Sequence, residues 1–346
     1  MSTSPFLYLA WFGYLARLSC LAQQVATTRW GPHVQDPQLA WLFGGVLGIL
    51  VLASVVGALL AETAKSDAAR ATIDNLNART RAWWKMCAIF ALTLLIGRIG
   101  SLVLFGLLSL LALREYVTLV PTRRGDHRTL AWIFFVITPL QYYLIGIRWY
   151  GFFAVMIPAV AFLFIPTRMA MSGDTEHFLE RAAKLQFGIM ICSYCLSHAP
   201  ALLILSIPGF EGHGARLLLY LVLVDQMSDV LQYVWGKLTG RHKIAPLVSP
   251  SKTWEGFIGG VLTATALGTA LWWATPFTPL QSAGMSLVIA LLGFAGGLVM
   301  SAIKRDVGVK DFGVIIEGHG GILDRMDSLC FAAPIFFHLV RYFFVP

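Results

Sequence analysis

Charged residues are scarce in this chain. Of 346 residues, 26 are Lys or Arg and 18 are Asp or Glu, so 13% are charged while 57% are hydrophobic. An ordinary soluble domain carries about 25% charged residues. Apolar runs long enough to cross a bilayer, about 17–25 residues each, recur along nearly the whole chain. The composition excludes an ordinary soluble domain and predicts an all-α polytopic membrane protein.

Cysteine is also scarce, and its five positions argue against two kinds of site. Cys20, Cys87 and Cys330 are scattered through apolar segments and indicate no disulfide framework. Cys192 and Cys195 form C-x-x-C inside an apolar run, but no second pair completes a four-ligand zinc site. We therefore interpret them as small buried hydrophobic residues.

The formal net charge of +8 does not indicate a nucleic-acid partner. The cations lie in loops beside the apolar runs, where anionic lipid explains them better. We expect an integral membrane protein of the bacterial inner membrane, with membrane lipids as partners and the basic loops in the cytoplasm.

About nine to eleven transmembrane helices are predicted. The first candidate is the weakest, since it contains Arg17 and could be an interfacial helix or an uncleaved anchor. The candidates are 6–24, 38–61, 86–97, 99–113, 129–146, 149–166, 186–206, 215–235, 254–275, 283–300 and 328–345.

Lys and Arg concentrate in 62–85, 114–128, 167–184, 236–253 and 301–327, so these loops are expected to be cytoplasmic and the C-terminus external. Both flanks of 86–113 are then on the same side. This favours a hairpin with its tip at Gly97-Arg98-Ile99-Gly100, over the alternative of one long tilted helix.

The span before the 236–253 loop contains ionisable residues that predict a site. Asp225, Asp229 and Gln232 are spaced i, i+4, i+7 and lie near one helix face. A buried carboxylate there requires a cation or a strong donor, although a polar packing seam is the plainer alternative. In the loop, Ser249 and Pro250 predict a helix start whose amides hold a phosphate with help from Lys252.

The 301–327 loop combines carboxylates, fixed cations and glycines. Asp324 and Asp327 are three apart, so on a helical turn both would face one way, and such oxygens suit Mg²⁺. Asp311 is followed closely by Gly313, which allows tight backbone folding against an anion or metal. An ordinary basic loop would not explain the carboxylates or His319-Gly320-Gly321.

These residues resemble the phosphatidate cytidylyltransferases, or CDP-diacylglycerol synthases. The family signature S-x-x-K-R-x4-K-D-x-G, then H-G-G-x-x-D-R-x-D, is matched by Ser301, Lys304, Arg305, Lys310, Asp311, Gly313, His319, Gly320, Gly321, Asp324, Arg325 and Asp327. A second block, D-x-x-A-Y-x-x-G followed by S-P-x-K-T-W-E-G, is similar to Asp229, Tyr233, Gly236, Ser249, Pro250, Lys252, Thr253, Trp254, Glu255 and Gly256.

The resemblance covers mainly 215–345, with a weaker echo of the family's A-L-R-E-[FY] in residues 112–116. We therefore divide one compact membrane domain into poorly diagnostic helices, 1–113, and a catalytic region, 114–346. The chain departs from the family at Gln232, where alanine is usual, and at Glu317, where Pro or Gly is usual. Both departures leave the lipid substrate open and identify a divergent branch.

The resemblance implies transfer of CMP from CTP to phosphatidate, a homodimer, and Mg²⁺, possibly with a second metal ion. It implies metal ligation by Asp229, Asp311, Asp324 and Asp327. Phosphate binding would come from Lys252, Lys304, Arg305, Lys310 and Arg325, aided by Ser249, Ser251, Gly320 and Gly321. His319 would orient a phosphate or a carboxylate.

Two other functions stay open on the residues alone. Another CTP-dependent enzyme could act on a different lipid phosphate or polyprenol, either as a cytidylyltransferase or as a kinase. Intramembrane acids also mark ion-coupled transporters, although the carboxylates cluster toward the C-terminus and no inverted pair of Gly-interrupted segments is apparent.

Overall fold

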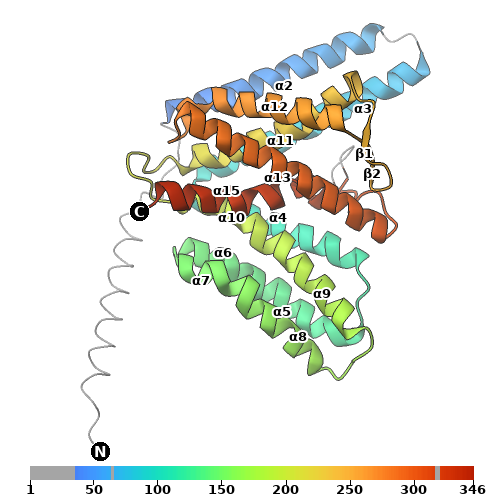
Figure 1. The fold of residues 1–346 in the computed structure, drawn as a ribbon, viewed down its shortest axis with the longest axis vertical. Helices are drawn as coiled ribbons and strands as arrows, with labels where there is room; N and C mark the ends of the chain where they lie inside the picture. The colour runs from blue at the N-terminus through green and yellow to red at the C-terminus, as the bar shows by residue number, and fades with distance from the viewer. Residues whose placement is uncertain (1–35, 64–65, 316–319) are drawn as a thin grey trace, which may run out of the picture.

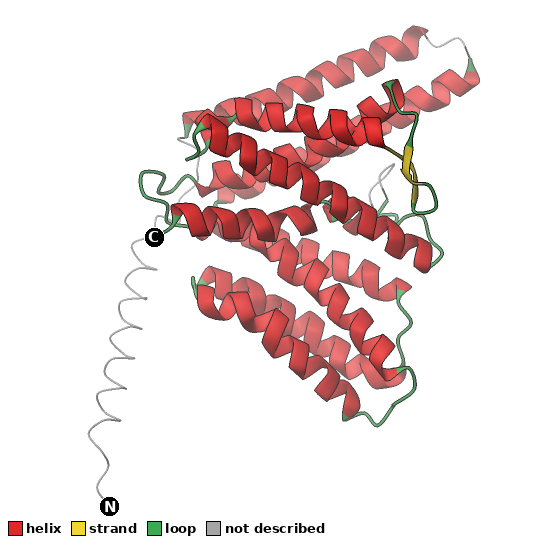
Figure 2. Ribbon diagram, viewed as in Figure 1, coloured by secondary structure: helices red, strands yellow, loops and turns green. Residues whose placement is uncertain are grey.

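The computed structural model describes residues 36–63, 66–315 and 320–346, and these residues are almost entirely helical (Figures 1 and 2). Three helices come first: α2 (Pro37–Thr63), α3 (Asp67–Ile96) and α4 (Arg98–Leu119). The candidate span 6–24 lies outside the described residues.

Three longer segments follow, each interrupted by a π-helical turn. They are η2 (Arg124–Asp126) with α5 (His127–Trp132), η3 (Ile133–Ile137) and α6 (Thr138–Gly146); α7 (Tyr150–Val155) with η4 (Met156–Ala161) and α8 (Phe162–Ala170); and α9 (Phe178–Ile189) with η5 (Met190–Cys195), α10 (Leu196–Ala201) and η6 (Leu202–Ile204).

The C-terminal part comprises α11 (Gly214–Leu238), a hairpin of β1 (Lys243–Ala245) and β2 (Ser249–Thr253), α12 (Trp254–Ala270), η7 (Trp272–Ala274), α13 (Pro279–Asp306), α14 (Leu323–Met326) and α15 (Leu329–Phe344). Helices α11, α12 and α13 pack side by side, and α15 lies between α13 and α10 (Figure 1). Most of the buried apolar side chains form one continuous core.

Seven described segments are long and apolar enough to span a membrane, and α15 is a shorter apolar helix. Their exposed surfaces carry large apolar side chains such as Trp41, Phe135 and Leu163. Without water to bind backbone groups in hydrocarbon, helices satisfy these groups internally. The chain is an all-α polytopic integral membrane protein, as the composition predicted.

The predicted hairpin at 97–100 is confirmed. Gly97 separates α3 from α4 with φ 87°, a conformation that suits glycine, and the two helices pack against each other. Arg98 donates to Ile145 O at 3.2 Å, so this tip lies at the end of the bundle where α6 ends. The alternative of a single long helix is wrong.

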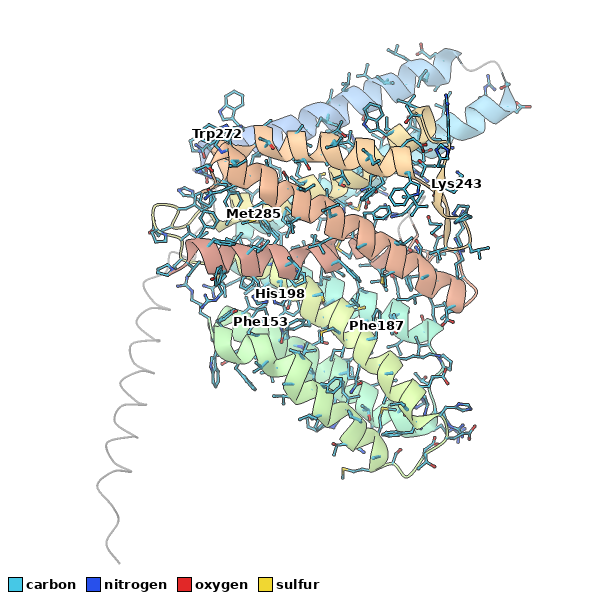
Figure 3. All side chains as sticks on the ribbon, in the orientation of Figure 1. Phe153, Phe187, His198, Lys243, Trp272 and Met285 are labelled. Carbon is cyan, nitrogen blue, oxygen red and sulfur yellow. The ribbon has the colours of Figure 1, made fainter. Side chains whose placement is uncertain are left out.

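The C-x-x-C segment is part of the core. His198 is fully buried, with its ring centroid 4.8 Å from that of Phe153 (labelled in Figure 3) and its Nδ1 2.8 Å from Tyr194 O. Cys192 and Cys195 are free thiols. Cys192 is buried, as predicted, whereas Cys195 is half-buried.

Candidate functional site

The predicted helix start at Ser249-Pro250 is wrong. Residues 249–253 form β2, which pairs antiparallel with β1 through Lys243 and Thr253 and holds the segment extended. The helix begins at Trp254, because the Thr253 hydroxyl accepts a hydrogen bond from Gly256 N at 3.1 Å and caps α12. A phosphate cradle made of helix amides therefore does not form at Ser249, which is buried, while Ser251 is exposed.

The β-hairpin directs Lys252 inward against α13. Its Nζ lies 4.5 Å from the centroid of the Phe294 ring and 3.5 Å from Phe294 O. A Cβ at Gly297 would lie 3.1 Å from this Nζ, so glycine leaves room for the cation. Burial lowers the pKa of Lys252, and the charges of Asp229 and Asp327 oppose that shift. Lys252 is thus a cation held beside two carboxylates.

Three carboxylates from two segments of the chain approach one another. Asp225 and Asp229 come from α11, and Asp327 follows α14. Burial, with the nearby charge of Asp229, raises the pKa of Asp327 to about 7, while Lys304 and Arg325 oppose the shift. Asp225 is fully buried; its Oδ2 accepts hydrogen bonds from Ser328 Oγ and Gln226 Nε2, both at 2.9 Å.

Two polar atoms in this cluster are buried without a hydrogen-bond partner among the described residues: Asp225 Oδ1 and Arg325 Nε. Buried polar groups in folded proteins are nearly always satisfied, so such atoms point to a ligand or water. The charge of Arg325 acts on Asp229 and Asp327. The cluster therefore contains one N–H that could bind an anion and one carboxylate oxygen that could bind a cation.

Asp324 has a different environment from Asp327, although a single turn separates them. Its Oδ1 accepts from Lys304 Nζ at 2.8 Å, and its Oδ2 accepts from the amides of Phe312 at 2.8 Å and Gly321 at 2.9 Å. Lys304 and Asp324 are both buried. Since both oxygens already accept bonds, this geometry suits Asp324 to ordering the loop.

The other predicted residues of the long loop are more exposed. Arg305 Nε donates to Val248 O at 3.3 Å, which connects the end of α13 to the β-hairpin turn. Lys310 and Asp311 are exposed, and a Cβ at Gly320 would lie 3.3 Å from that of Asp311. Gly320 has φ 81°, a backbone conformation that favours glycine. His319 and Glu317 lie outside the described residues.

Across residues 36–63, 66–315 and 320–346, no group of three or more His, Cys, Asp or Glu side chains is arranged to hold a metal ion by itself. Mg²⁺ sites that act on nucleotides commonly use one or two carboxylates together with substrate phosphates. The two carboxylates of Asp229 and Asp327 fit such a donor set. The residues are thus compatible with a metal that arrives with its nucleotide.

Gln232 packs between helices. Its Nε2 donates to Ser228 Oγ at 2.9 Å, and a Cβ at Gly260 would lie 2.4 Å from its Cγ. The same Cβ would lie 2.6 Å from Gln232 Cα, so Gly260 is required by the close approach of the α11 backbone as well as by the glutamine side chain.

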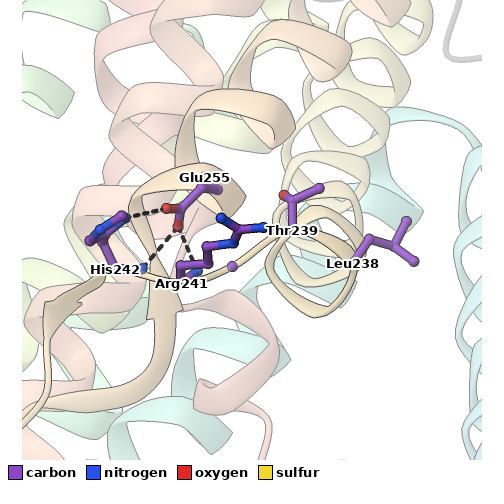
Figure 4. A pocket seen from close by; sticks show the side chains of 6 residues that line it. Leu238, Thr239, Arg241, His242 and Glu255 are labelled. Atoms are coloured by element: carbon purple, nitrogen blue, oxygen red, sulfur yellow. Dashed lines mark hydrogen bonds and ion pairs between the residues drawn. The ribbon is translucent and has the colours of Figure 1, made fainter.

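An open pocket of about 460 Å³ lies where α11 leads into β1. Glu255 lines it and accepts from the amides of Arg241 at 3.0 Å and His242 at 3.2 Å (Figure 4). Its other lining residues are Leu238, Thr239 and Gly240. It contains none of the predicted site residues, so it lies apart from the carboxylate cluster.

Sequence reasoning left two contributors without a role. Ser328 connects Asp225 to the segment that carries Asp327. Glu115, 207 residues before Ile322 in the sequence, accepts bonds from the amides of Ile322 and Leu323. The faint A-L-R-E-[FY] echo was the available signal for Glu115.

The fold is that of a polytopic membrane protein, and its cluster of half-buried acids and cations is suited to binding phosphate groups. Residues 77–343 match the cytidylyltransferase family, and the chain belongs to this family. It is therefore a nucleotidyltransferase of the membrane, in agreement with the motif resemblance.

Two kinds of protein are similar in sequence to this chain. Over 268 residues it is 41% identical to the uncharacterized protein YnbB of Escherichia coli (strain K12), covering 76% of this chain and 87% of that protein. Over 157 residues it is 38% identical to the phosphatidate cytidylyltransferase of Staphylococcus aureus (strain COL), covering 44% and 60%. The Staphylococcus epidermidis (strain ATCC 12228) phosphatidate cytidylyltransferase is 36% identical over 160 residues, with the same coverage. The match thus spans about three fifths of the proteins named for that activity.

Proposed function

We propose that this protein transfers CMP from CTP to phosphatidate, giving CDP-diacylglycerol and pyrophosphate in phospholipid biosynthesis. The observation that carries the proposal is the cluster in which Lys252 and Arg325 lie beside Asp229 and Asp327. Cytidylyltransferase family membership supports CTP and a lipid phosphate as substrates. The staphylococcal relatives named phosphatidate cytidylyltransferase support phosphatidate in particular.

The chemistry needs electrostatic stabilisation more than proton transfer. A phosphate monoester has a second pKa near about 6 and is largely anionic at neutral pH. Its oxygen attacks the α-phosphorus of CTP, the bond from that phosphorus to the bridging oxygen breaks, and pyrophosphate leaves with the bonding electrons. No dedicated general base is required.

Lys252 and Arg325 are the cations that we assign to the phosphates of CTP, with Lys304, Arg305 and Lys310 extending the positive field around them. Preorganised charges of this kind stabilise negative charge that develops in the transition state. We propose Asp229 and Asp327 as the residues that hold Mg²⁺, with Asp311 as a further candidate, and His319 as a residue that orients a phosphate or a carboxylate. Bound Mg²⁺ would screen the CTP phosphates and stabilise the leaving pyrophosphate.

We place the site at the cytoplasmic face of the inner membrane, because the loops that carry it are rich in Lys and Arg. CTP would enter from the cytoplasm, and phosphatidate would arrive from the inner leaflet. A homodimer is our proposal for the assembly, on the basis of the family resemblance.

The test uses purified protein in detergent with phosphatidate, [α-³²P]CTP and Mg²⁺, following CDP-lipid and pyrophosphate. We expect Lys252→Met to lower kcat at least about 100-fold, the effect of removing one strong electrostatic contact. Lys243→Met is the matched control, since Lys243 is exposed on the same hairpin. Equal activity of the two variants would contradict the role of Lys252.

The products separate the proposal from its alternatives. Pyrophosphate release with another lipid phosphate, but not with phosphatidate, would reassign the acceptor. CDP release in place of pyrophosphate would indicate a kinase. Absence of CTP binding, measured by isothermal titration on folded protein, would favour the ion-coupled transporter. Removal of Mg²⁺ with EDTA should abolish transfer, and transfer at an undiminished rate would refute the metal requirement.

A further inference from the structure

Glu115 reaches the candidate site from a helix that sequence reasoning did not connect with it. It lies on α4, and its side chain is buried. Its Oε1 accepts from Ile322 N and its Oε2 accepts from Leu323 N, both at 2.9 Å. Both carboxylate oxygens thus hold consecutive amides more than two hundred residues away in the sequence.

Two glycines enclose the Glu115 carboxylate. A Cβ at Gly313 would lie 2.6 Å from Oε1 and 2.8 Å from Cδ, and a Cβ at Gly321 would lie 2.4 Å from Oε2. Neither glycine has a positive φ, so their backbones do not demand glycine. The absence of a side chain at both positions instead leaves room for this carboxylate.

The amides held by Glu115 lead directly into the site. Gly321, Ile322 and Leu323 are followed by Asp324, Arg325 and Asp327. On the same loop, Asp324 accepts bonds from Phe312 N and Gly321 N. Glu115 and Asp324 together accept bonds from four backbone amides that would otherwise be buried without a partner.

Tyr116, the residue after Glu115, contacts α9. Tyr116 Oη donates to Lys184 O at 3.1 Å, and a Cβ at Gly188 would lie 2.5 Å from the Tyr116 ring. Two consecutive residues of α4 therefore contact the site loop and the second half of α9. A buried pair of contacts of this kind sets the position of the loop relative to the membrane helices.

We propose that Glu115 is a positioning residue for the nucleotidyl-transfer site: its carboxylate sets the backbone from which Arg325 and Asp327 extend. Only the catalytic consequence rests on the proposed function. Residues that orient metal ligands from behind typically change metal affinity or activity about 10–100-fold when they are mutated, and Asp327 is a metal ligand in the proposed function.

Glu115→Gln tests the proposal with nearly constant volume. Glutamine offers one acceptor oxygen, and its NH₂ would face the second amide, which needs an acceptor. We expect kcat to fall at least about 10-fold with a smaller change in KM for CTP. The control is Arg114→Gln, because Arg114 is the exposed neighbour on the same helix. Normal kcat in Glu115→Gln would overturn the proposal.

Hydrogen–deuterium exchange gives a readout that does not depend on activity. Peptides covering 320–327 should exchange faster in Glu115→Gln than in the parent protein, while peptides from α12 remain protected. If the parent protein transfers no CMP to phosphatidate, the proposed function fails, and this measurement still tests the contact. Unchanged protection over 320–327 would refute the positioning role itself.

A double-mutant cycle separates positioning from a general packing defect. Gly313→Ala should lower kcat in the parent protein, because its Cβ displaces the Glu115 carboxylate. In a Glu115→Ala background the same change should have little further effect, since the clash is gone. Additive losses would show that the two positions act separately and would contradict the inference.

Discussion

Helix α2 and helix α12 contain the same spacing of small residues, but only in α12 does that spacing face a closely packed helix, α11. Gly44 and Gly48 on α2, and Gly256 and Gly260 on α12, both read as small-xxx-small pairs. A Cβ at Gly44 or Gly48 would meet no heavy atom of the described residues within 4 Å, whereas one at Gly260 would lie 2.6 Å from Gln232 Cα. Small residues at this spacing permit close helix packing, but glycine is required only where another helix packs against that face.

The two regions also differ in how they use charge. On the side of α2, Asp36 forms an ion pair with Arg216 at 2.5 Å, which anchors the start of the helix. Around the site, Lys304 and Asp324 are buried together, and Asp225 and Arg325 each have a buried polar atom with no hydrogen-bond partner in the described part of the chain. The acid beside α2 is thus paired with an arginine, whereas two buried polar atoms at the site have no hydrogen-bond partner among the described residues and are suited to contacting a ligand.

The largest expected loss of stability is in Asp324→Asn. Breaking a buried ion pair leaves the other charge uncompensated and costs about 3–5 kcal/mol. We expect a lower thermal midpoint in detergent together with loss of CMP transfer. The matched control is Asp311→Asn, an exposed acid on the same loop. Equal midpoints for the two variants would contradict the buried role of Asp324.

Asp327→Asn should separate activity from stability. Between the unfolded pKa near 3.8 and the folded pKa near 7, the folded protein binds a proton that the unfolded chain has released. Stability therefore falls as pH rises through this window. Removing the charge should raise the thermal midpoint at pH 8 in metal-free buffer, with a smaller gain at pH 5.5, and should lower kcat at least about 100-fold.

The opposite pattern is the outcome that would contradict this assignment. A variant less stable at pH 8 than the parent protein would mean that Asp327 is paired with a cation in the absence of ligand. Asp327→Asn would then behave as Asp324→Asn does, and the contrast between the two acids would disappear.

Gly260→Ala probes the tight contact between α11 and α12. Its Cβ would lie 2.6 Å from backbone atoms of Gln232, so the helices must separate. Overpacking of this kind costs about 1–3 kcal/mol, measured as a lower thermal midpoint. A second variant, Gly260→Ala with Gln232→Ala, should not regain the thermal midpoint of the parent protein, because the clash includes the α11 backbone. Full recovery would show that only the side chain matters.

Gly44→Ala should have the smallest effect. No atom of residues 36–63, 66–315 or 320–346 lies within 4 Å of the added Cβ, and alanine favours helix over glycine. The free energy of unfolding should stay within about 0.5 kcal/mol of the parent value, and any change should be an increase. A clear loss of stability would mean that another surface, such as a second copy of the chain, covers this face of α2.

Sequence patterns predicted the architecture well because hydrophobicity and loop charge are local properties. The apolar runs indicated membrane helices, and the Lys and Arg distribution indicated the turn at Gly97 that the structure contains. The motif residues also led to the correct family. Local patterns failed at Ser249, since strand pairing with β1 decides that Thr253, four residues later, caps the helix.

What the sequence determined by itself is the class: apolar runs of spanning length, basic loops, and a set of acids and cations in family spacing. Only the tertiary structure decided how the acids differ. Asp324 and Asp327 look equivalent when three residues apart, yet one faces Lys304 and two amides while the other faces Asp229. The same holds for Glu115, whose partners lie in another part of the chain. The environment of a carboxylate depends on which segments fold around it, and spacing along one segment does not contain that information.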